Sequence, residues 1–480
     1  MLRSGTALPR ERRAMTDDIA LLSAAALVER YRAGTLSPVD VVRACLDRIA
    51  AHNPVLNAFR SVDAGGALAA AEKSAQRYET CKPKGPLDGV PVSIKDTLLA
   101  RGWPTLRGSR TVDPDQPWRE DAPAVQRLRE TGAILMGRTT TPEFGWKGVT
   151  DSPLTGITRN PWNPELTPGG SSGGAAAAAA AGMAAINLGT DGGGSIRIPA
   201  SFTGVYGFKP SYGRVPAYPI SAFGTLSVVG PLTRTVADAA LAMQVLSRPD
   251  PRDWTAVPCP APDFSEELDR GVAGLRIAFA PALAGEPVDL EVAARVRSAA
   301  DAFADLGADV TETAAPLDGA GRCFGRHWAV GAALAVAAVP EEKRALMDPG
   351  LLAMAAAAAG LSAVDDGAAV LERHRLGNAM VRFHETYDLL LTPTEPIVAF
   401  AAGHDTPPDG PYRGWEGWTP FTYPFNLTMQ PAATVPCGLT AAGLPVGLQI
   451  VARLHRDDLV LRASRAFEQA RPWPLPALPG

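Results

Sequence analysis

The sequence predicts an α/β fold in which helices cover a single large, mixed β-sheet. Stretches typical of strands and of helices alternate along the chain, as they do in proteins that pack helices around a sheet. Hydrophobic residues make up 46% of the 480 residues, enough for a large buried core and too many for a disordered chain. No period of about 20–50 residues recurs, which excludes a solenoid.

The elements expected in the first half begin with helices. Apolar residues recur at helical spacing over residues 20–51, and Ser37 provides the N-cap of a second helix there, with a proline after it as the first helical residue. Residues 88–95 (DGVPVSIK) form a short, alternating, β-branched run, which indicates a strand. A helix over residues 122–131 and a buried strand over residues 133–137 follow.

Strand and helix patterns alternate again in the second half. A strand over residues 275–279 precedes a helix from about residue 289 to 306, and a strand over residues 387–392 follows another helical stretch. Stretches rich in proline and glycine at 249–262 and 403–414 are candidate linkers or lids. Neither is long or polar enough to establish a domain boundary.

Composition excludes several classes of function. Lys and Arg number 46 against 50 Asp and Glu, so the net charge of −4 offers no broad positive field for nucleic acid. The five cysteines are scattered without a C-x-x-C pair, so neither a disulfide framework nor a zinc knuckle is expected, and a reducing, cytoplasmic location is predicted. No apolar run suits a secretory signal, and residues 175–188 are too short and alanine-rich for a membrane span of about 20 residues.

Glycine is concentrated in one region. Nine of the 47 glycines lie within residues 169–194, in two clusters that flank an alanine-rich helical stretch and a probable strand over residues 185–189. A flexible linker is the alternative, but two glycine turns around one packed helix favour a structural device. Residues 169–173 also match G-x-S-x-G, which we regard as accidental because prolines precede it where that motif needs a strand.

The second cluster, residues 189–199, follows the strand and places three glycines before Ser195. Such a run can turn successive N–H groups toward one point, which suits either a phosphate or the oxyanion of acyl transfer to Ser195. No P-loop lysine or G-x-G-x-x-G accompanies it, so the oxyanion is preferred. None of the six histidines lies in a serine-hydrolase motif. Lys95, at the end of an apolar strand, is a candidate base, although an ion pair with Asp96 or another acid explains it equally well.

Three segments of this chain resemble the amidase signature hydrolases: residues 89–96 (GVPVSIKD), 169–174 (GGSSGG) and 189–197 (GTDGGGSIR). Supporting matches lie at residues 141–144, 160–163, 207–210, 230–232 and 445–449, so the resemblance covers nearly the whole chain. It implies the single mixed sheet of that family and hydrolysis of carboxylic amide C–N bonds through an acyl-enzyme. It implies no metal and no organic cofactor.

The resemblance also assigns residues to roles. Ser195 is the implied nucleophile, Ser171 the bridging serine, which takes part in a cis peptide in that family, and Lys95 the base. The N–H groups of Gly192, Gly193, Gly194 and Ser195 would form the oxyanion hole. Supporting roles that hold the loop fall to Thr190, Asp191 and Arg197, and substrate contacts fall to Gly145 and Trp146.

The resemblance further suggests one amidase domain over residues 16–480, after an expected disordered tail at residues 1–15. Met15 is an alternative start, which would make the first fourteen residues dispensable. Within it, N-terminal helices would occupy about 16–80 and the catalytic core about 85–245, with the remainder completing the sheet and the cleft. The expected partner is a small-molecule amide, with neither nucleic acid nor a membrane involved, and the chain could form a homodimer.

Seven aromatic residues between positions 400 and 425 suit either a core segment or the lining of an apolar pocket, and a pocket would fit apolar or aryl amides, esters or carbamates. Two alternative functions are kept. The chain could be the glutaminase component of a tRNA-dependent amidotransferase, although residues 213–230 lack the Ser-Leu-Asp-Gln stretch associated with that component. It could be a non-catalytic binding module, which intact Lys95, Ser171 and Ser195 disfavour.

Overall fold

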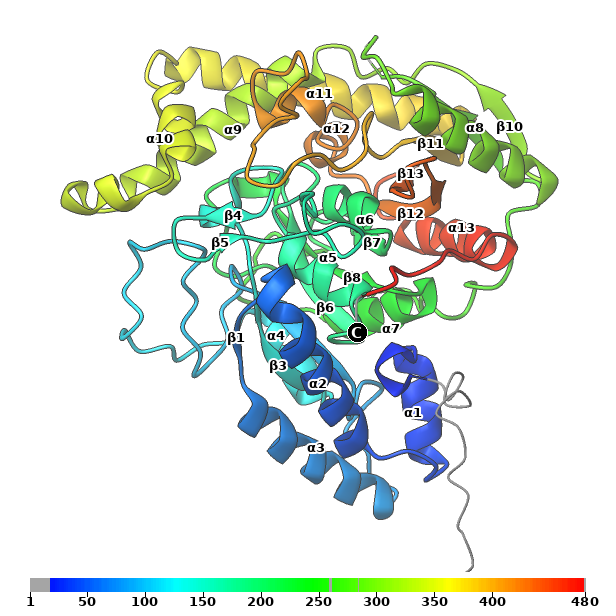
Figure 1. The fold of residues 1–480 in the computed structure, drawn as a ribbon. Helices are drawn as coiled ribbons and strands as arrows, with labels where there is room; N and C mark the ends of the chain where they lie inside the picture. The colour runs from blue at the N-terminus through cyan, green and yellow to red at the C-terminus, as the bar shows by residue number, and fades with distance from the viewer. Residues whose placement is uncertain (1–17, 259–260, 284, 479–480) are drawn as a thin grey trace, which may run out of the picture.

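A computed structural model of the chain describes residues 18–258, 261–283 and 285–478 (Figure 1). Its main sheet has 11 strands within these described residues, in the order β1-β3-β2-β6-β8-β7-β12-β13-β11-β9-β10. The pairing is mixed, since β2 is parallel to β3 and β6 whereas β7, β8, β12 and β13 pair antiparallel with their neighbours. The predicted α/β fold with one large mixed sheet is confirmed. The expected tail, residues 1–15, lies outside the described residues.

The strands of the main sheet have the following bounds: β1 Phe59–Val62, β2 Pro91–Lys95, β3 Ile134–Thr139, β6 Ile186–Asp191, β7 Tyr206–Lys209, β8 Val228–Thr233, β9 Arg276–Phe279, β10 Asp309–Glu312, β11 Leu389–Pro393, β12 Ala432–Leu439 and β13 Pro445–Ala452. The helices are α1 Ala24–Arg32, α2 Pro38–Leu56, α3 Ala64–Glu79, α4 Pro123–Glu130, α5 Gly173–Ala180, α6 Arg197–Thr203, α7 Val236–Leu246, α8 Leu290–Asp305, α9 Ala320–Ala337, α10 Pro349–Ala356, α11 Ala363–Thr386, α12 Pro424–Leu427 and α13 Asp457–Ala470. A separate hairpin joins β4 Asp151–Ser152 to β5 Gly156–Ile157.

Local chemistry explains the helix boundaries. The Ser37 side chain accepts a hydrogen bond from the N–H of Val39, and Pro38 opens α2, as the N-cap pattern predicts. The helix ends at Asn57, which adopts a left-handed backbone (φ 48°) and donates its N–H to the carbonyl of Asn53. Helix α11 begins with a capping box between Ser362 and Asp365.

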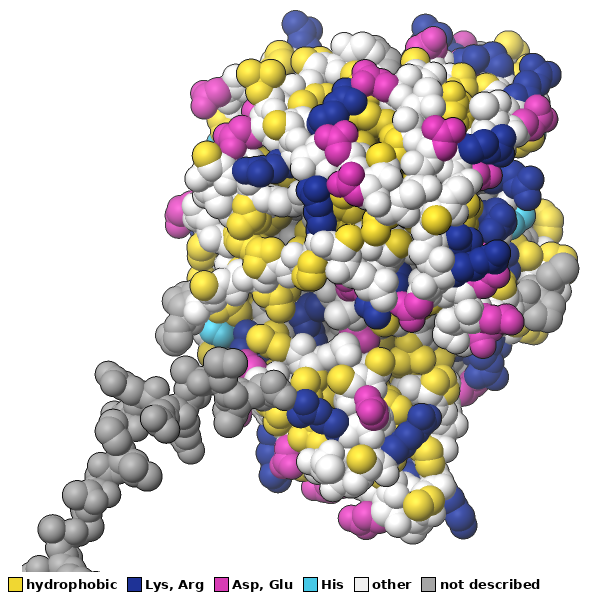
Figure 2. Space-filling model, turned by 90° about the vertical axis from the view of Figure 1, so that its right-hand side faces the viewer, with side chains coloured by type: hydrophobic (Ala, Val, Ile, Leu, Met, Phe, Trp, Pro, Cys, Tyr) yellow, Lys and Arg dark blue, Asp and Glu magenta, His cyan; other side chains and the backbone are white. Residues whose placement is uncertain are grey.

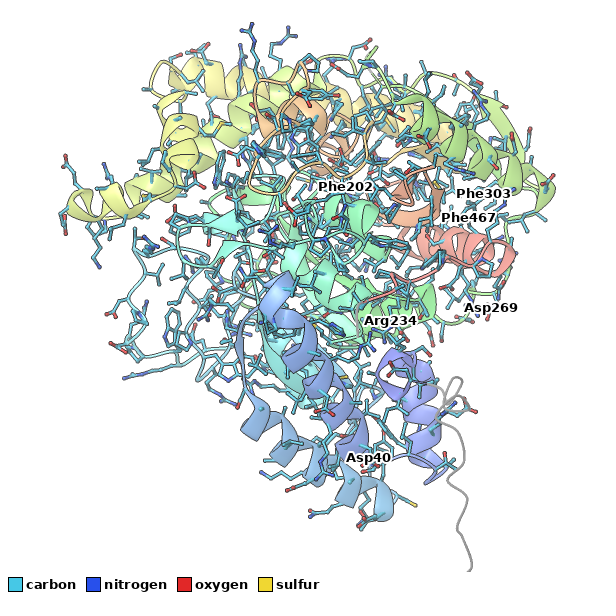
Figure 3. The ribbon with its side chains drawn as sticks, in the orientation of Figure 1. Asp40, Phe202, Arg234, Asp269, Phe303 and Phe467 are labelled. Carbon is cyan, nitrogen blue, oxygen red and sulfur yellow. The ribbon has the colours of Figure 1, made fainter. Side chains whose placement is uncertain are left out.

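Successive strand residues contribute to different apolar clusters, as expected for a sheet covered on both faces. In β11, Leu389 and Leu391 pack into the larger cluster, whereas Leu390 packs into a second, aromatic-rich cluster. The larger cluster includes side chains of α1–α4, α7, α8 and α13, and Figure 3 places Phe303 of α8 near Phe467 of α13, whose rings stack 5.5 Å apart. The second cluster lies under α9–α11, at the opposite end of the molecule from α1–α3 (Figure 1).

The aromatic residues between positions 400 and 425 belong to this second cluster. Six are buried in it, and the seventh, Tyr412, is half-buried against it. Of the two interpretations left open by the sequence, the core segment is the one observed. On the face shown in Figure 2, Lys and Arg side chains are interspersed with Asp and Glu.

Candidate active site

The site lies at the carboxyl ends of two neighbouring strands. Strands β2 and β6 run parallel, so Lys95 at the end of β2 and Asp191 at the end of β6 reach the same edge of the sheet. Two glycine-rich turns meet there, because the N–H of Ser172 donates to the carbonyl of Ser195 over 3.1 Å. The second of these turns follows β6 directly.

Lys95 is fully buried among hydroxyl groups. Its Nζ donates to Ser171 Oγ at 2.7 Å, to Ser172 Oγ at 2.9 Å and to Thr190 Oγ1 at 2.9 Å. Burial lowers the pKa of Lys95 well below the usual lysine range, and the negative charge of Asp191 offsets this only in part. The structure therefore places at this edge an amine that can be neutral and accept a proton.

The ion pair considered for Lys95 and Asp96 is not observed. Asp96 pairs instead with Arg60, at 3.0 Å from Nε, and with Arg138, at 2.7 Å from Nε. Among the described residues, no carboxylate forms an ion pair with Lys95, whose charged form is therefore poorly compensated.

Ser171 sits in the turn that precedes α5. The Gly170–Ser171 peptide bond is cis, and the side chain of any residue replacing Gly170 would collide with the backbone of Val149. Ser172 was not assigned a role from the sequence, yet its hydroxyl accepts from Lys95 and donates to the carbonyl of Thr190 over 3.1 Å. Its only sequence signal is its place beside Ser171 in the same motif.

The backbone N–H groups around Ser195, the nucleophile candidate, differ in whether they already donate a hydrogen bond. The N–H of Gly194 donates to Asp191 Oδ1 over 2.8 Å, so it is already engaged and the expectation that it contributes to the oxyanion hole is revised. Within the described part of the chain, no hydrogen-bond acceptor is found for the N–H groups of Gly192, Gly193 and Ser195. These three remain as the candidate oxyanion donors.

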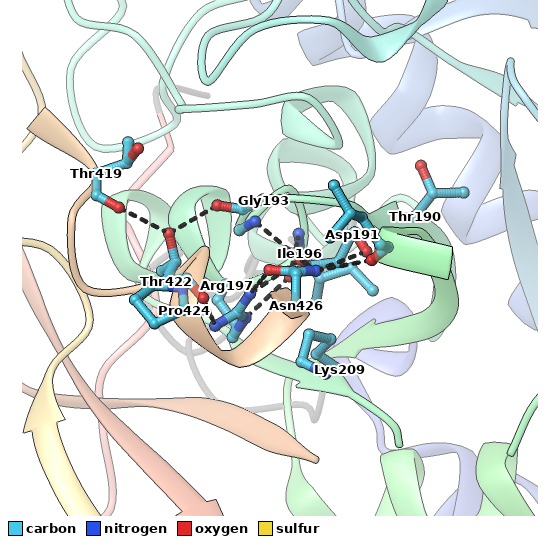
Figure 4. Close-up of polar contacts among 12 residues, drawn as sticks. Thr190, Asp191, Gly193, Ile196, Arg197, Lys209, Thr419, Thr422, Pro424 and Asn426 are labelled. Carbon is cyan, nitrogen blue, oxygen red and sulfur yellow. Dashed lines mark hydrogen bonds and ion pairs between the residues drawn. The ribbon is translucent and has the colours of Figure 1, made fainter. Parts of the chain in front are cut away.

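Asp191 and Arg197 anchor this loop to the C-terminal part of the chain (Figure 4). The fully buried Arg197 binds Asp191 through Nη2 at 2.9 Å and Nε at 3.0 Å. Arg197 also donates to Gln449 Oε1 at 2.7 Å and to Asn426 Oδ1 at 2.6 Å. The positive charge of Arg197, together with its hydrogen bonds, holds the pKa of the Asp191 carboxyl far below its usual range despite burial.

The sequence predicted the holding role of Asp191 and Arg197 but not their partners. Gln449 lies in one of the segments that carried the family resemblance, residues 445–449, which was the one available signal for it. Asn426 had no such signal, and its side chain donates to the carbonyl and carboxylate of Asp191 over 3.0 and 2.8 Å.

A cleft of about 850 Å³ opens over this site. It is lined by Ser171, Thr190, Gly192 and Ser195, so both serines border one space. Gly145 also lines it, and a Cβ there would lie 3.2 Å from Ser171 Oγ.

Trp146, expected as a substrate contact, lies behind the cleft wall instead of lining it. Only 4% of it is exposed, and its indole N–H donates to Asp348 over 3.2 Å. Its carbonyl accepts from the indole N–H of Trp328, which does line the cleft. The seven aromatic residues of the 400–425 segment, all of them described, are also absent from the lining.

Two further features are missing from the described residues. No group of three or more His, Cys, Asp or Glu side chains there could hold a metal ion. Likewise, none of the helices in the described ranges has the combined length and apolar character needed to cross a bilayer.

Comparison with known proteins identifies the family. The sequence pattern of the Amidase family matches residues 40–461. An acylamidase of Rhodococcus erythropolis is 38% identical over 466 residues, which cover 94% of this chain and 96% of that protein. A glutamyl-tRNA(Gln) amidotransferase component of Synechococcus sp. (strain RCC307) is 37% identical over 469 residues, covering 92% of this chain and 96% of that protein.

Solved structures agree with the sequence matches. The crystal structure of a bacterial aryl acylamidase of the amidase signature family superposes with a TM-score of 0.88 at 34% identity, covering 94% of this chain and 97% of that one. A 6-aminohexanoate cyclic dimer hydrolase in complex with substrate gives a TM-score of 0.85 at 29% identity, covering 95% and 98% of the two chains. The chain therefore belongs to the amidase signature family of amide-hydrolysing enzymes.

Proposed function

We propose that the chain hydrolyses amides through an acyl-enzyme on Ser195, with Ser171 passing protons between Ser195 and Lys95. The observation that carries this proposal is the contact between Ser171 Oγ and the buried amine of Lys95, which forms no ion pair with a carboxylate among the described residues. Ser171 and Ser195 also border the same cleft. A lysine kept neutral by desolvation can serve as the base for a serine nucleophile. Thr190 and Ser172 orient the amine toward Ser171.

The proposed reaction has two steps. Ser195 Oγ attacks the amide carbonyl carbon as its proton passes to Ser171 and the Ser171 proton passes to Lys95. The free N–H groups of Gly192, Gly193 and Ser195 stabilise the oxyanion, and the reversed relay protonates the departing amine. Water then attacks the acyl ester with its proton passing along the same relay, which releases the carboxylic acid and restores Ser195.

The walls of the cleft support apolar or aryl amides as substrates. Its lining includes Leu98, Phe144, Phe223 and Trp328. At its mouth, Ile220, Leu334 and Trp254 are exposed by 64%, 57% and 91%. Exposed apolar side chains gathered at one opening are typical of a binding surface. The acylamidase and aryl acylamidase relatives point the same way.

Glutamine hydrolysis within an amidotransferase is the second candidate, because an amidotransferase relative is 37% identical to this chain. The apolar mouth favours the stand-alone amidase, since glutamine also presents a charged ammonium. Asp253, the carboxylate that lines the cleft within the described residues, is already bound by two backbone N–H groups. Activity on glutamine alone, dependent on added partner proteins, would reverse this preference.

The test is a panel of aliphatic, aryl and carbamate substrates with glutamine alongside, assayed with the parent and Ser195→Ala. We expect cleavage of an aryl or apolar amide, lowered at least about a thousandfold by Ser195→Ala. A fluorophosphonate should label the parent and a Ser61→Ala control, whose serine is exposed on β1, but not Ser195→Ala. Full activity of Ser195→Ala would remove Ser195 as nucleophile, and no labelling with no hydrolysis would favour a binding module.

A further inference from the structure

Arg107 is held beside the site by its backbone. Its N–H donates to the carbonyl of Asp96 over 3.0 Å, and its own carbonyl accepts from the N–H of Phe144 over 2.7 Å. Asp96 directly follows Lys95, and Phe144 directly precedes Gly145, so Arg107 is tied to two segments that border the cleft. The residue adopts a left-handed backbone (φ 55°), which costs a non-glycine residue free energy and tends to be kept where a side chain has a task.

The guanidinium of Arg107 has no counter-charge bound to it. Within the described residues, no hydrogen bond or ion pair of its side chain is found. Asp96, the carboxylate whose charge acts on it, is already bound by Arg60 and Arg138. Asp96 is thus occupied by two other arginines, and burial lowers the pKa of Arg107 while the charge of Asp96 offsets that only in part.

Arg107 lines two adjoining spaces. It borders the cleft of about 850 Å³ that contains Ser195, and also a second cavity of about 580 Å³. Phe144, Ala335 and Ala338 line both as well, so the two spaces share a wall. Arg107 is half-buried and therefore borders both spaces from which a substrate group could approach it.

The other charged side chains of the cleft are already satisfied. Arg252 binds both oxygens of Asp250, at 2.9 and 2.8 Å. Asp253 accepts from the N–H of Ala217 over 2.9 Å and from that of Thr255 over 2.9 Å. Among the described residues that line the cleft, Arg107 is the charged side chain left without a partner.

We propose that Arg107 binds a carboxylate on the substrate, so that the preferred amides combine an apolar body with a carboxylate remote from the scissile bond. The planar guanidinium presents paired N–H donors that match a carboxylate, and a partly desolvated site strengthens that contact. The second cavity, whose lining includes Arg119 and Lys343 as well as Asp113 and Glu120, gives room for the carboxylate end. This inference rests on the proposed function.

The experiment compares matched substrates. One pair carries the charge on the acyl side, glutaryl-4-nitroanilide against its methyl ester, and the other on the amine side, 4-acetamidobenzoate against its methyl ester. For each pair, the ratio of kcat/KM for the acid to kcat/KM for the ester is measured in the parent, Arg107→Met, Arg107→Lys and Arg110→Met. Arg110 is exposed on the same loop and lines neither cavity, so it controls for long-range charge.

We expect the parent to prefer the acid in at least one pair. Arg107→Met should lower that ratio about ten- to a hundredfold, largely through KM, because it removes a hydrogen-bonded charge partner. Arg107→Lys should keep part of the preference, since it keeps the charge but not the paired donors. Arg110→Met should leave the ratio within about twofold of the parent.

If the parent shows no preference for the acid in either pair, the inference is overturned without any variant. It is also overturned if Arg107→Met and Arg110→Met change the ratio of kcat/KM for acid to ester equally. If Arg107→Met does not fold, the acid-to-ester ratio of Arg107→Lys tests the inference, and a ratio equal to that of the parent contradicts it. Should the parent cleave neither pair and Ser195 resist the fluorophosphonate, the proposed function fails separately. Calorimetric binding of glutaryl-4-nitroanilide to Ser195→Ala, with and without Arg107→Met, then still tests Arg107, and equal affinities contradict its role.

Discussion

At the scale of single residues, the environment of Lys95 decides what the site can do. A lysine surrounded by three hydroxyl groups and apolar strands finds no counter-charge for an ammonium, so the neutral amine is favoured. Asp191, a few residues away from the nucleophile candidate, shows the opposite case. Arg197 binds its carboxylate directly, so its pKa falls and it stays ionised well into the acid range.

This contrast predicts the pH dependence. Since the pKa of Lys95 is lowered, the amine is free to accept a proton above that pKa and is protonated below it. We expect kcat/KM for a neutral amide to rise from acid toward neutral or alkaline pH, with a limb of about tenfold per pH unit where Lys95 titrates. The rate of fluorophosphonate labelling should follow the same limb. A profile already flat at pH 5 would contradict Lys95 as the base.

Lys209 supplies the control for that profile, because it is the other fully buried lysine of this region. Burial and the nearby charge of Arg197 lower the pKa of Lys209 to about 7, and its Nζ donates to the carbonyls of Pro210 and Gln430. In Lys209→Met the acid limb should persist with the same midpoint. Its disappearance would assign the titration to Lys209 instead.

At the scale of elements, helix α5 shows why the glycine clusters are rigid. Every residue of α5 is buried, and a Cβ on Gly174 would lie 2.5 Å from the backbone nitrogen of Thr140 and 2.6 Å from the carbonyl oxygen of Ala58. Glycine at this position lets the helix lie directly against two backbone segments. The composition that suggested a flexible linker is therefore used for close packing around Ser171 and Ser172.

We expect Gly174→Ala to destabilise the protein by about 1–3 kcal/mol, because neither backbone segment can move aside without cost. The matched control is Gly367→Ala in α11, where the glycine is exposed and open space surrounds the added methyl group. That change should stabilise the protein by about 0.5–1 kcal/mol through helix propensity. Urea denaturation of both variants measures the difference, and an equal effect of the two would contradict the packing argument.

Elements were predictable from the sequence where a local period defines them. Helices α4 and α8 lie within a residue of their expected ranges, and strand β2 ends where expected but begins three residues later, because alternation and helical spacing are properties of neighbouring residues. Contacts between segments that lie far apart in the chain could not be predicted in this way. The pairing of β7 with β12 joins residues more than two hundred positions apart, and no local pattern encodes it.

The site, too, was predictable only in part. The resemblance to a known family, rather than spacing, brought Lys95, Ser171 and Ser195 together as candidates. The burial of Trp146 and the engagement of the Gly194 N–H by Asp191 depend on how chain segments pack, so the motif alone could not reveal them.

At the scale of the whole molecule, the two halves of the chain share one sheet. Strands β12, β13 and β11 from the C-terminal half stand between β7 and β9, and β12 pairs with β7 in register, Ala432 opposite Lys209. The side chain of Arg197 adds a buried link to Gln449. A loop that carries the proposed nucleophile thus depends on strands formed near the end of the chain.

This shared sheet predicts that the region from residue 16 to 480 unfolds as one domain. Far-UV circular dichroism, tryptophan fluorescence and loss of activity should give coincident urea transitions. Gln449→Leu should lower the free energy of unfolding by about 1–3 kcal/mol, because it leaves a donor of the buried Arg197 unpaired. The midpoints of all three transitions should therefore move together to lower urea. Gln469→Leu, exposed on α13, should change stability by less than about 0.5 kcal/mol. Activity lost at a urea concentration where fluorescence and dichroism remain native would instead reveal a C-terminal unit that separates from the rest.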